Sequence, residues 1–201
     1  MSTTSAPRGL KPISLLGGLP FAGSTMELPI VSNYGTAIFN GDVVGFNDVT
    51  NGTDATDGYI VRESAAGEVN PVGVFLGCSY TDPNTSQKTW NQYYPGSIVA
   101  SDIKAVVTVN PTTLYEIQAD GAVTQAKLGQ TIDLVQTTAS PSTVIKNSGL
   151  QADASTAAIT GKCWRIVDFV NRPGSSVGDT YTDLIVMMNQ QEHALVAAAI
   201  T

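Results

Sequence analysis

The chain has 201 residues, of which 42 % are hydrophobic and 13 % charged, and its formal net charge is −7. This length suits one domain with short arms. The acidic balance excludes a typical nucleic-acid binder, which concentrates Lys and Arg to neutralise phosphates. No apolar run reaches the roughly 18–20 residues that cross a bilayer. From the charge we therefore predict no nucleic-acid partner, and from the short apolar runs no membrane partner.

Residues 1–26 are predicted to form an extended N-terminal arm. Three prolines and four glycines exclude a regular helix, and Arg8 and Lys11 give the arm a net charge of +2. The arm is too apolar for a solvated tail, so it should lie on a surface of its own domain or of a neighbour. Its candidate contact residues are Arg8, Leu10, Lys11, Ile13, Leu15 and Leu16. We expect the domain to fold without it. Gly and Pro also interrupt any signal-peptide-like run, so we expect the protein to stay in the cytoplasm where it is made.

Residues 27–190 are predicted to form a single all-β domain, a β-barrel or a jelly-roll-like sandwich. Short runs rich in Val, Ile, Tyr and Thr alternate with Gly, Asn and Pro, which is typical of such folds. The predicted strands are 27–32, 36–39, 42–46, 59–63, 71–80, 97–109, 113–118, 122–124, 131–135, 142–145, 162–170 and 181–188. Residues 151–159 could be one helical turn or a loop. The apolar tail, residues 191–201, is expected to dock on the domain.

The stretch 71–111 is the centre of this domain: two apolar runs flank a polar and aromatic loop. Trp90, Tyr93 and Tyr94 form the densest aromatic cluster of the chain. Aromatic side chains fill cores and also anchor protein interfaces. We therefore predict that these three residues lie in the core or at a subunit interface, and we keep glycan stacking as a weaker alternative.

Reactive motifs are missing from the sequence, so we predict neither an enzyme nor a cofactor or metal site. His193 is the only histidine, and no nucleophile elbow, paired-histidine motif or phosphate-binding loop occurs. Cys78 and Cys163 lie in separate apolar runs, which favours two buried free thiols over a disulfide. Asp48, Asp54 and Asp57 could bind calcium, but their spacing does not match a calcium-binding loop and suits turn formation better.

Several segments, which together span most of residues 9–190, resemble the small head proteins of tailed bacteriophages known as capsid cement or decoration proteins. They are Gly9–Pro12 with Leu15, Phe39–Val44, Gly73–Pro83, Trp90 with Tyr93–Gly96, Ile98–Ile103, Tyr115–Gly121 and Ile166–Val170. The resemblance implies a β-rich homotrimer that binds the major capsid protein on the outer surface of the virion. It transfers no catalytic residues.

This resemblance gives the candidate residues their expected roles. The arm would bind the capsid, and Trp90, Tyr93 and Tyr94 would lie near a contact between subunits. The same aromatic residues would serve a glycan- or host-receptor-binding module of the virion, which is the alternative function. The sequence does not show which symmetry axis is used, or whether the arm crosses to a neighbouring subunit.

Overall fold

The computed structural model describes residues 4–47, 57–63, 71–136, 146–159 and 161–189. In this part the chain forms antiparallel sheets packed as a sandwich, which confirms the predicted all-β fold; the described sheets do not close into a barrel. A single 3-10 turn, η1 (Gln125–Lys127), is the only helix found there. The strands are β1 (Lys11–Leu15), β2 (Met26–Pro29), β3 (Val43–Phe46), β4 (Ile60–Arg62), β5 (Gly73–Thr81), β6 (Lys88–Asn91), β7 (Lys104–Thr108), β8 (Thr113–Gln118), β9 (Thr131–Ile132), β10 (Leu134–Gln136), β11 (Leu150–Ala152), β12 (Trp164–Phe169) and β13 (Asp183–Met188).

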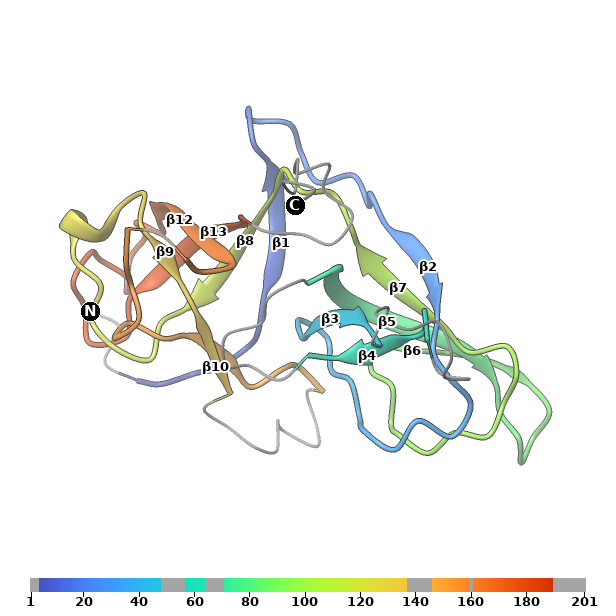
Figure 1. Cartoon of the computed structure of the whole chain (residues 1–201). Helices are drawn as coiled ribbons and strands as arrows, with labels where there is room; N and C mark the ends of the chain where they lie inside the picture. Colours follow the sequence, from blue (N-terminus) through green and yellow to red (C-terminus); the bar gives the residue numbers. More distant parts are fainter. Residues whose placement is uncertain (1–3, 48–56, 64–70, 137–145, 160, 190–201) are drawn as a thin grey trace.

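Sheet A has the strand order β1-β8-β13-β12-β9, so the first strand of the chain joins the C-terminal half (Figure 1). Every pairing in this sheet is antiparallel. Its central strands contain Val, Ile, Leu and Tyr at alternating positions, which suits a pleated sheet with one face on a core. Because β1 lies at the end of this order, it is an edge strand with β8 as its ladder partner.

Sheet B has the order β2-β7-β5-β3-β4, and β6 pairs with the C-terminal half of β5. It contains the central stretch of the sequence: β5 is the longest strand, with nine residues, and is buried along most of its length. A separate two-stranded ribbon pairs β10 with β11. Figure 1 shows the two sheets side by side, joined by the segment from β1 to β2 and by the β7–β8 connection.

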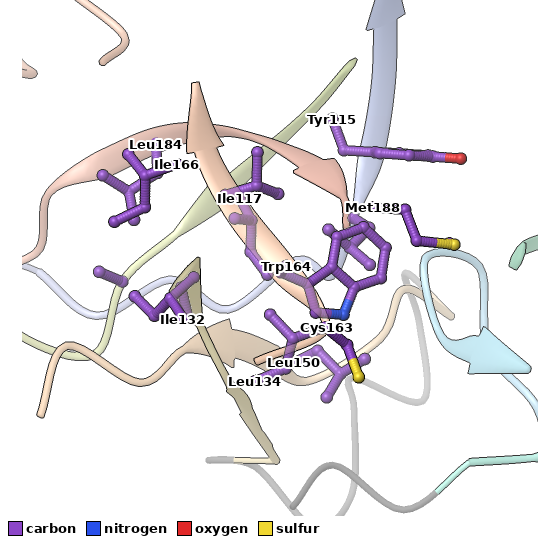
Figure 2. Close-up of a cluster of buried hydrophobic side chains, with 14 of the residues drawn as sticks. Tyr115, Ile117, Ile132, Leu134, Leu150, Cys163, Trp164, Ile166, Leu184 and Met188 are labelled. Atoms are coloured by element: carbon purple, nitrogen blue, oxygen red, sulfur yellow. The ribbon is translucent and has the colours of Figure 1, made fainter. Parts of the chain in front are cut away.

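Two clusters of buried apolar side chains stabilise the sandwich. The first lies under sheet A and includes Tyr115 and Trp164, whose rings meet edge to face with centroids 5.7 Å apart (Figure 2). The second lies under sheet B around Phe75 and Tyr94. Such rings bury large apolar areas, so each cluster makes a major contribution to stability.

The start of β3 and of β5 belongs to both clusters. Val43 and Val74 are register partners and pack in the first cluster, whereas the next residues along each strand, Val44 and Phe75, pack in the second. Successive side chains of a strand point to opposite faces, so here both faces of sheet B are buried. Strands β3 and β5 of sheet B therefore contribute side chains to both clusters.

Most predicted strands are present, with the differences concentrated in loops. The predicted strand 97–109 shortens to β7, and 131–135 divides into β9 and β10. No strand forms at 122–124, and the predicted strand 36–39 reduces to an isolated bridge between Ile38 and Tyr94. The predictions for 142–145 and for the tail 191–201 lie outside the described residues. Three strands were not predicted: β11, which opens the ambiguous segment 151–159 before its loop, and β1 and β6, where Pro and polar residues interrupt the apolar pattern.

Candidate functional site

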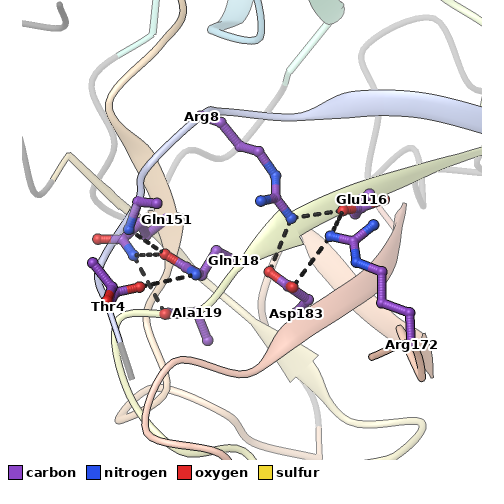
Figure 3. A network of polar contacts seen from close by, with 9 residues as sticks. Thr4, Arg8, Glu116, Gln118, Ala119, Gln151, Arg172 and Asp183 are labelled. Atoms are coloured by element: carbon purple, nitrogen blue, oxygen red, sulfur yellow. Dashed lines mark hydrogen bonds and ion pairs between the residues drawn. The ribbon is translucent and has the colours of Figure 1, made fainter. Parts of the chain in front are cut away.

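The N-terminal segment 4–15, here called the strap, lies on the chain's own sheet A. Gln118 holds its backbone: the Ala6 N–H donates to Oε1 of Gln118 at 2.6 Å, and Nε2 of Gln118 donates to the Thr4 carbonyl at 3.4 Å (Figure 3). The Ser5 hydroxyl donates to Oε1 of a second glutamine, Gln151, at 3.3 Å. The sequence left open whether this segment lies on its own domain or on a neighbour. In the structure it lies on its own domain.

Arg8 lies at the centre of a four-residue ion-pair cluster, here called the arginine cluster (Figure 3). One Arg8 nitrogen lies 2.6 Å from the Glu116 carboxylate and 2.9 Å from that of Asp183. Arg172 bridges the same two carboxylates at 2.7 and 3.3 Å, and its hydrogen bond to Glu116 raises the pKa of Arg172. Both carboxylates are largely buried, so the two arginines balance two charges that burial would otherwise penalise.

Leu10 is an integral core residue, with 1 % of its surface exposed. The neighbouring Gly9 is required by a close crossing, because a Cβ built on it would lie 2.5 Å from that of Ser148 and its φ is +69°. From Lys11 to Leu15 the strap then pairs with β8, with an irregularity between Pro12 and Ser14. Arg8 and Leu10 are therefore engaged inside the fold. Removing residues 1–26 would delete an edge strand and a core side chain, so we now expect the truncated domain to lose stability, in place of the earlier expectation that the domain folds without the arm.

The other arm residues divide into partly covered and exposed ones. Ile13 and Leu15 are half-buried, and Lys11 is exposed. Beyond the strap, residues 16–25 form a connection to β2, here called the hinge segment. Its large side chains Leu16 and Leu19 are 51 % and 62 % exposed. Of the predicted contact residues, Leu16 has the largest exposed apolar surface.

The aromatic cluster does not form one surface. Tyr94 is fully enclosed in the second core; its hydroxyl donates to the Tyr34 carbonyl at 3.0 Å and accepts from the Ile98 N–H at 3.3 Å. Burial raises the pKa of Tyr94. The sequence left two locations open for Tyr94, the core and a subunit interface. The structure places its side chain in the core, where a partner subunit cannot reach it.

Tyr93 and Trp90 have quite different surroundings. The Tyr93 ring stacks on Phe39, with centroids 5.9 Å apart and an angle of 6° between the planes. Nζ of Lys146 lies 4.5 Å from the centroid of the same ring, within cation–π range. Trp90, in contrast, is 67 % exposed on β6, opposite Ser79 of β5. Only Trp90 of the three therefore offers a large aromatic surface to a partner.

An exposed ion pair lies in the part of sheet B that carries Trp90. The Lys88 ammonium lies 2.8 Å from the Asp102 carboxylate, which also accepts hydrogen bonds from the Thr81 N–H and hydroxyl. These bonds, with that from Lys88 the largest cause, hold the pKa of Asp102 well below its usual range. Lys104 is the register partner of Ser79 on the other side. The surroundings of Trp90 are thus polar, as in the rim of a protein interface.

A second charged pair, missed by the sequence reasoning, stabilises the join between the sheets. Asp42 is fully buried, lies 2.9 Å from Arg62 and accepts from the Phe39 N–H at 2.8 Å. Burial is the largest cause of a raised Asp42 pKa, which the Arg62 charge opposes. The Asn40-Gly41 turn beside it was the available signal, since a turn dipeptide followed by Asp marks a constrained backbone. Its location at the join could not be inferred from that signal.

The described residues contain no group of three or more His, Cys, Asp or Glu side chains that could hold a metal ion. Asp48, Asp54 and His193 lie outside the described residues. Cys78 and Cys163 are buried and free, which confirms the predicted thiols, and burial raises the pKa of Cys78 to about 12. In the same part of the chain, no helix is long and apolar enough to cross a membrane.

Comparison of the chain with protein-family models, with curated protein sequences and with solved structures finds no match.

Proposed function

We propose that this chain is a structural protein of a phage particle: a homotrimeric cement protein that binds the major capsid protein on the outer surface of the head and transforms no substrate. The observation that carries the proposal is Trp90, which is 67 % exposed although the other tryptophan, Trp164, lies in a core. Tryptophan is among the residues most enriched at the energetic centres of interfaces. An exposed tryptophan surrounded by polar side chains therefore suits attachment to another protein.

The segments that resemble decoration proteins include the strands next to Trp90, which supports the proposal. The similar segments Gly73–Pro83 and Ile98–Ile103 contain β5, the ladder partner of β6, and lead into β7, which pairs with β5 on its other side. Because Arg8 and Leu10 are engaged in their own sheet, the proposal gives the contact with the shell to the Trp90 surface, and not to those two residues. Lys88 and Lys104 would orient that contact against acidic groups of the shell.

A trimer can stabilise the shell even if each of its contacts with the shell is weak. A trimer placed where capsomers meet presents the same contact three times. Three weak contacts on one rigid body act together through their effective concentration. Binding that favours the expanded shell over the disrupted shell then stabilises the expanded shell by mass action. No single contact needs to be strong.

The test is the occupancy of purified heads that lack the protein, after incubation with wild-type chain, Trp90→Ala or Val177→Ala. Val177 is also an exposed apolar side chain, at 40 %, but belongs to a loop near sheet A, so it is a matched control. We expect Trp90→Ala to lower occupancy at least tenfold with an unchanged unfolding midpoint, and Val177→Ala to bind normally. Equal occupancy for wild type and Trp90→Ala would contradict the proposed contact, and no binding by wild type would contradict the cement function.

A glycan- or receptor-binding module of the virion is the second candidate, and the same exposed tryptophan favours it. Aromatic faces stack on sugar rings, and Trp90 leaves 67 % of its surface exposed. A glycan array separates the two functions. Hits that disappear with Trp90→Ala, without binding to heads, would favour the module; binding to heads without hits would favour the cement protein.

A further inference from the structure

We infer that the strap is exchanged between copies of the chain: residues 4–15 of one subunit dock on sheet A of the next, and three subunits close into a ring. This inference deepens the proposed function, because it rests on the trimer and names the surface that holds the trimer together. Exchange of an identical element is a low-cost route to an oligomer, because the element finds the same contacts on a neighbour as on its own body.

The strap makes its contacts on sheet A and on two segments beside it. On sheet A it forms the β1–β8 ladder, places Leu10 in the first core and pairs Arg8 with Glu116 and Asp183. Beside the sheet, the Gly9 N–H donates to the Leu150 carbonyl at 3.2 Å and the Leu10 N–H to the Gly41 carbonyl at 3.0 Å. Every partner in this set belongs to a part of the body that comes after the hinge segment in the sequence. A strap from a second copy can therefore make all of them, with no loss of buried area or ion pairs.

The hinge segment is built so that it can open. The Leu15 N–H donates to the Leu19 carbonyl at 2.8 Å and the Gly18 N–H to the Leu15 carbonyl at 3.2 Å, which folds the chain back in a tight turn. A Cβ on Gly17 or Gly18 would meet nothing within 4 Å, and both have positive φ. Straightening the turn breaks these two bonds, the bridge between Ser14 and Pro20 and the bond from the Leu16 N–H to the Thr112 carbonyl at 2.7 Å, but no contact of a core side chain. Ten residues from Leu16 to Thr25, when extended, span up to about 35 Å, which is enough to reach a neighbouring body.

The exposed apolar surface of the hinge segment is the feature that exchange explains. No charged residue occurs from Pro12 to Met26. Within that run Leu16, Leu19 and Met26 are 51 %, 62 % and 48 % exposed. A single copy leaves these side chains in water. Where hinge segments of neighbouring copies pass between the bodies, the same side chains are covered by an identical uncharged segment.

The test places a cysteine pair across the strap and its sheet. Ser14 and Leu114 are register partners on β1 and β8, so Ser14→Cys with Leu114→Cys can form a disulfide wherever the strap docks. Glu27→Cys with Val106→Cys is the matched control, because this pair links β2 and β7, both after the hinge segment. Cys78 and Cys163 are buried and should not react in the folded protein.

Both variants are oxidised in solution without capsids and run on a denaturing gel without reductant. We expect the Ser14–Leu114 variant to form covalent trimers and the control to run as a single chain. A single-chain band for the Ser14–Leu114 variant, with its thiols consumed, would overturn the exchange, and so would a monomeric mass by light scattering. Neither outcome touches binding to heads, so failure of the exchange is distinguishable from failure of the cement function.

Deletion of Gly17 and Gly18 tests the inference without relying on a disulfide. The shortened hinge segment cannot make the tight turn, so a strap that docks on its own body would be pulled from β8. We expect the deleted protein to remain a trimer with an unchanged unfolding midpoint. A shift to monomer together with a lower midpoint would show that the strap needs the turn, and would overturn the exchange.

Discussion

The N-terminal segment of strap and hinge and the segment from Trp90 to Tyr94 belong to different sheets, yet each combines a buried apolar side chain with an exposed one. Each contains large apolar side chains beside Pro and Gly, and each has the character of a contact surface. In the strap, Leu10 is buried while the hinge segment beyond it is exposed; in the aromatic segment, Tyr94 is buried while Trp90 is exposed. Within each segment, a few residues therefore separate a core residue from a surface residue. Composition marks a segment as apolar, but strand register decides which side chain a partner can reach.

The largest effect should come from Tyr94→Ala, which tests the buried half of the aromatic segment. Removing an enclosed aromatic ring costs about 3–5 kcal/mol in the free energy of unfolding. Trp90→Ala should change it by less than about 0.5 kcal/mol, because the side chain is mostly in water. Urea unfolding of both variants measures the difference. Equal losses would mean that Trp90 is covered in the folded protein.

A third variant separates packing from hydrogen bonding at Tyr94. Tyr94→Phe keeps the ring and removes the hydroxyl that bonds to the Tyr34 carbonyl and the Ile98 N–H. We expect a loss of about 1–3 kcal/mol, because two hydrogen bonds are lost and the Ile98 N–H is left without this acceptor. A loss as large as that of Tyr94→Ala would indicate that the hydroxyl network, and not the ring, holds residues 34 and 98 together.

The sequence was informative about this region only in part. The apolar run of β5 and the return through β7 follow from Val, Ile and Phe at strand spacing, and the structure has both. The position of Trp90 does not follow, because β6 is polar and short and its face is set by pairing with β5. A four-residue strand with Lys, Thr and Asn has no periodic apolar signal, so its exposed face is decided by tertiary contacts.

The next largest effect should come from Leu10→Ala, which tests the buried half of the strap. The truncated side chain leaves a cavity in the first core, at an expected cost of about 2–5 kcal/mol in unfolding free energy. Leu128→Ala is the matched control: Leu128 is 42 % exposed and should cost less than about 0.5 kcal/mol. Chemical unfolding checks both. A negligible loss for Leu10→Ala would mean that the strap does not pack on sheet A in solution.

A smaller effect is expected from Arg8→Gln, which tests the polar hold on the strap. Glu116 and Asp183 keep Arg172 as a partner, and Arg8 is partly exposed, so the loss should be about 1–2 kcal/mol and not the larger cost of stranding a buried charge. Arg172→Gln should cost less, since its side chain is more exposed. Urea unfolding of the two variants gives the order, and a reversed order would mean that Arg172 is the main partner of the carboxylates.

The arginine cluster also shows where sequence reasoning ends. Its four members come from positions 8, 116, 172 and 183, and no spacing rule connects them. They meet because β8 and β13 are neighbours and the strap lies across them, and this topology is set by long-range pairing. Arg8 was singled out as one of only two charged residues in the arm, with Lys11. Its partners gave no comparable signal, because isolated acids in strands are common.

The smallest effect concerns Asp102, an exposed counterpart to the buried charges near the strap. Its pKa is held below the usual range chiefly by the hydrogen bond from Lys88. A carboxyl whose folded pKa is lowered adds stability above its ordinary pKa of about 3.9, and this contribution is lost as the pH falls through the lowered pKa.

Asp102→Asn removes the titrating group, so the unfolding free energy of this variant should fall less than that of wild type as the pH drops below about 4. Lys88→Met should give the same flatter profile, because it removes the main cause of the shift. Urea unfolding at a series of pH values measures all three proteins. Parallel profiles for wild type and both variants would mean that Lys88 and Asp102 do not pair in solution, and that the surface around Trp90 is not fixed by this pair.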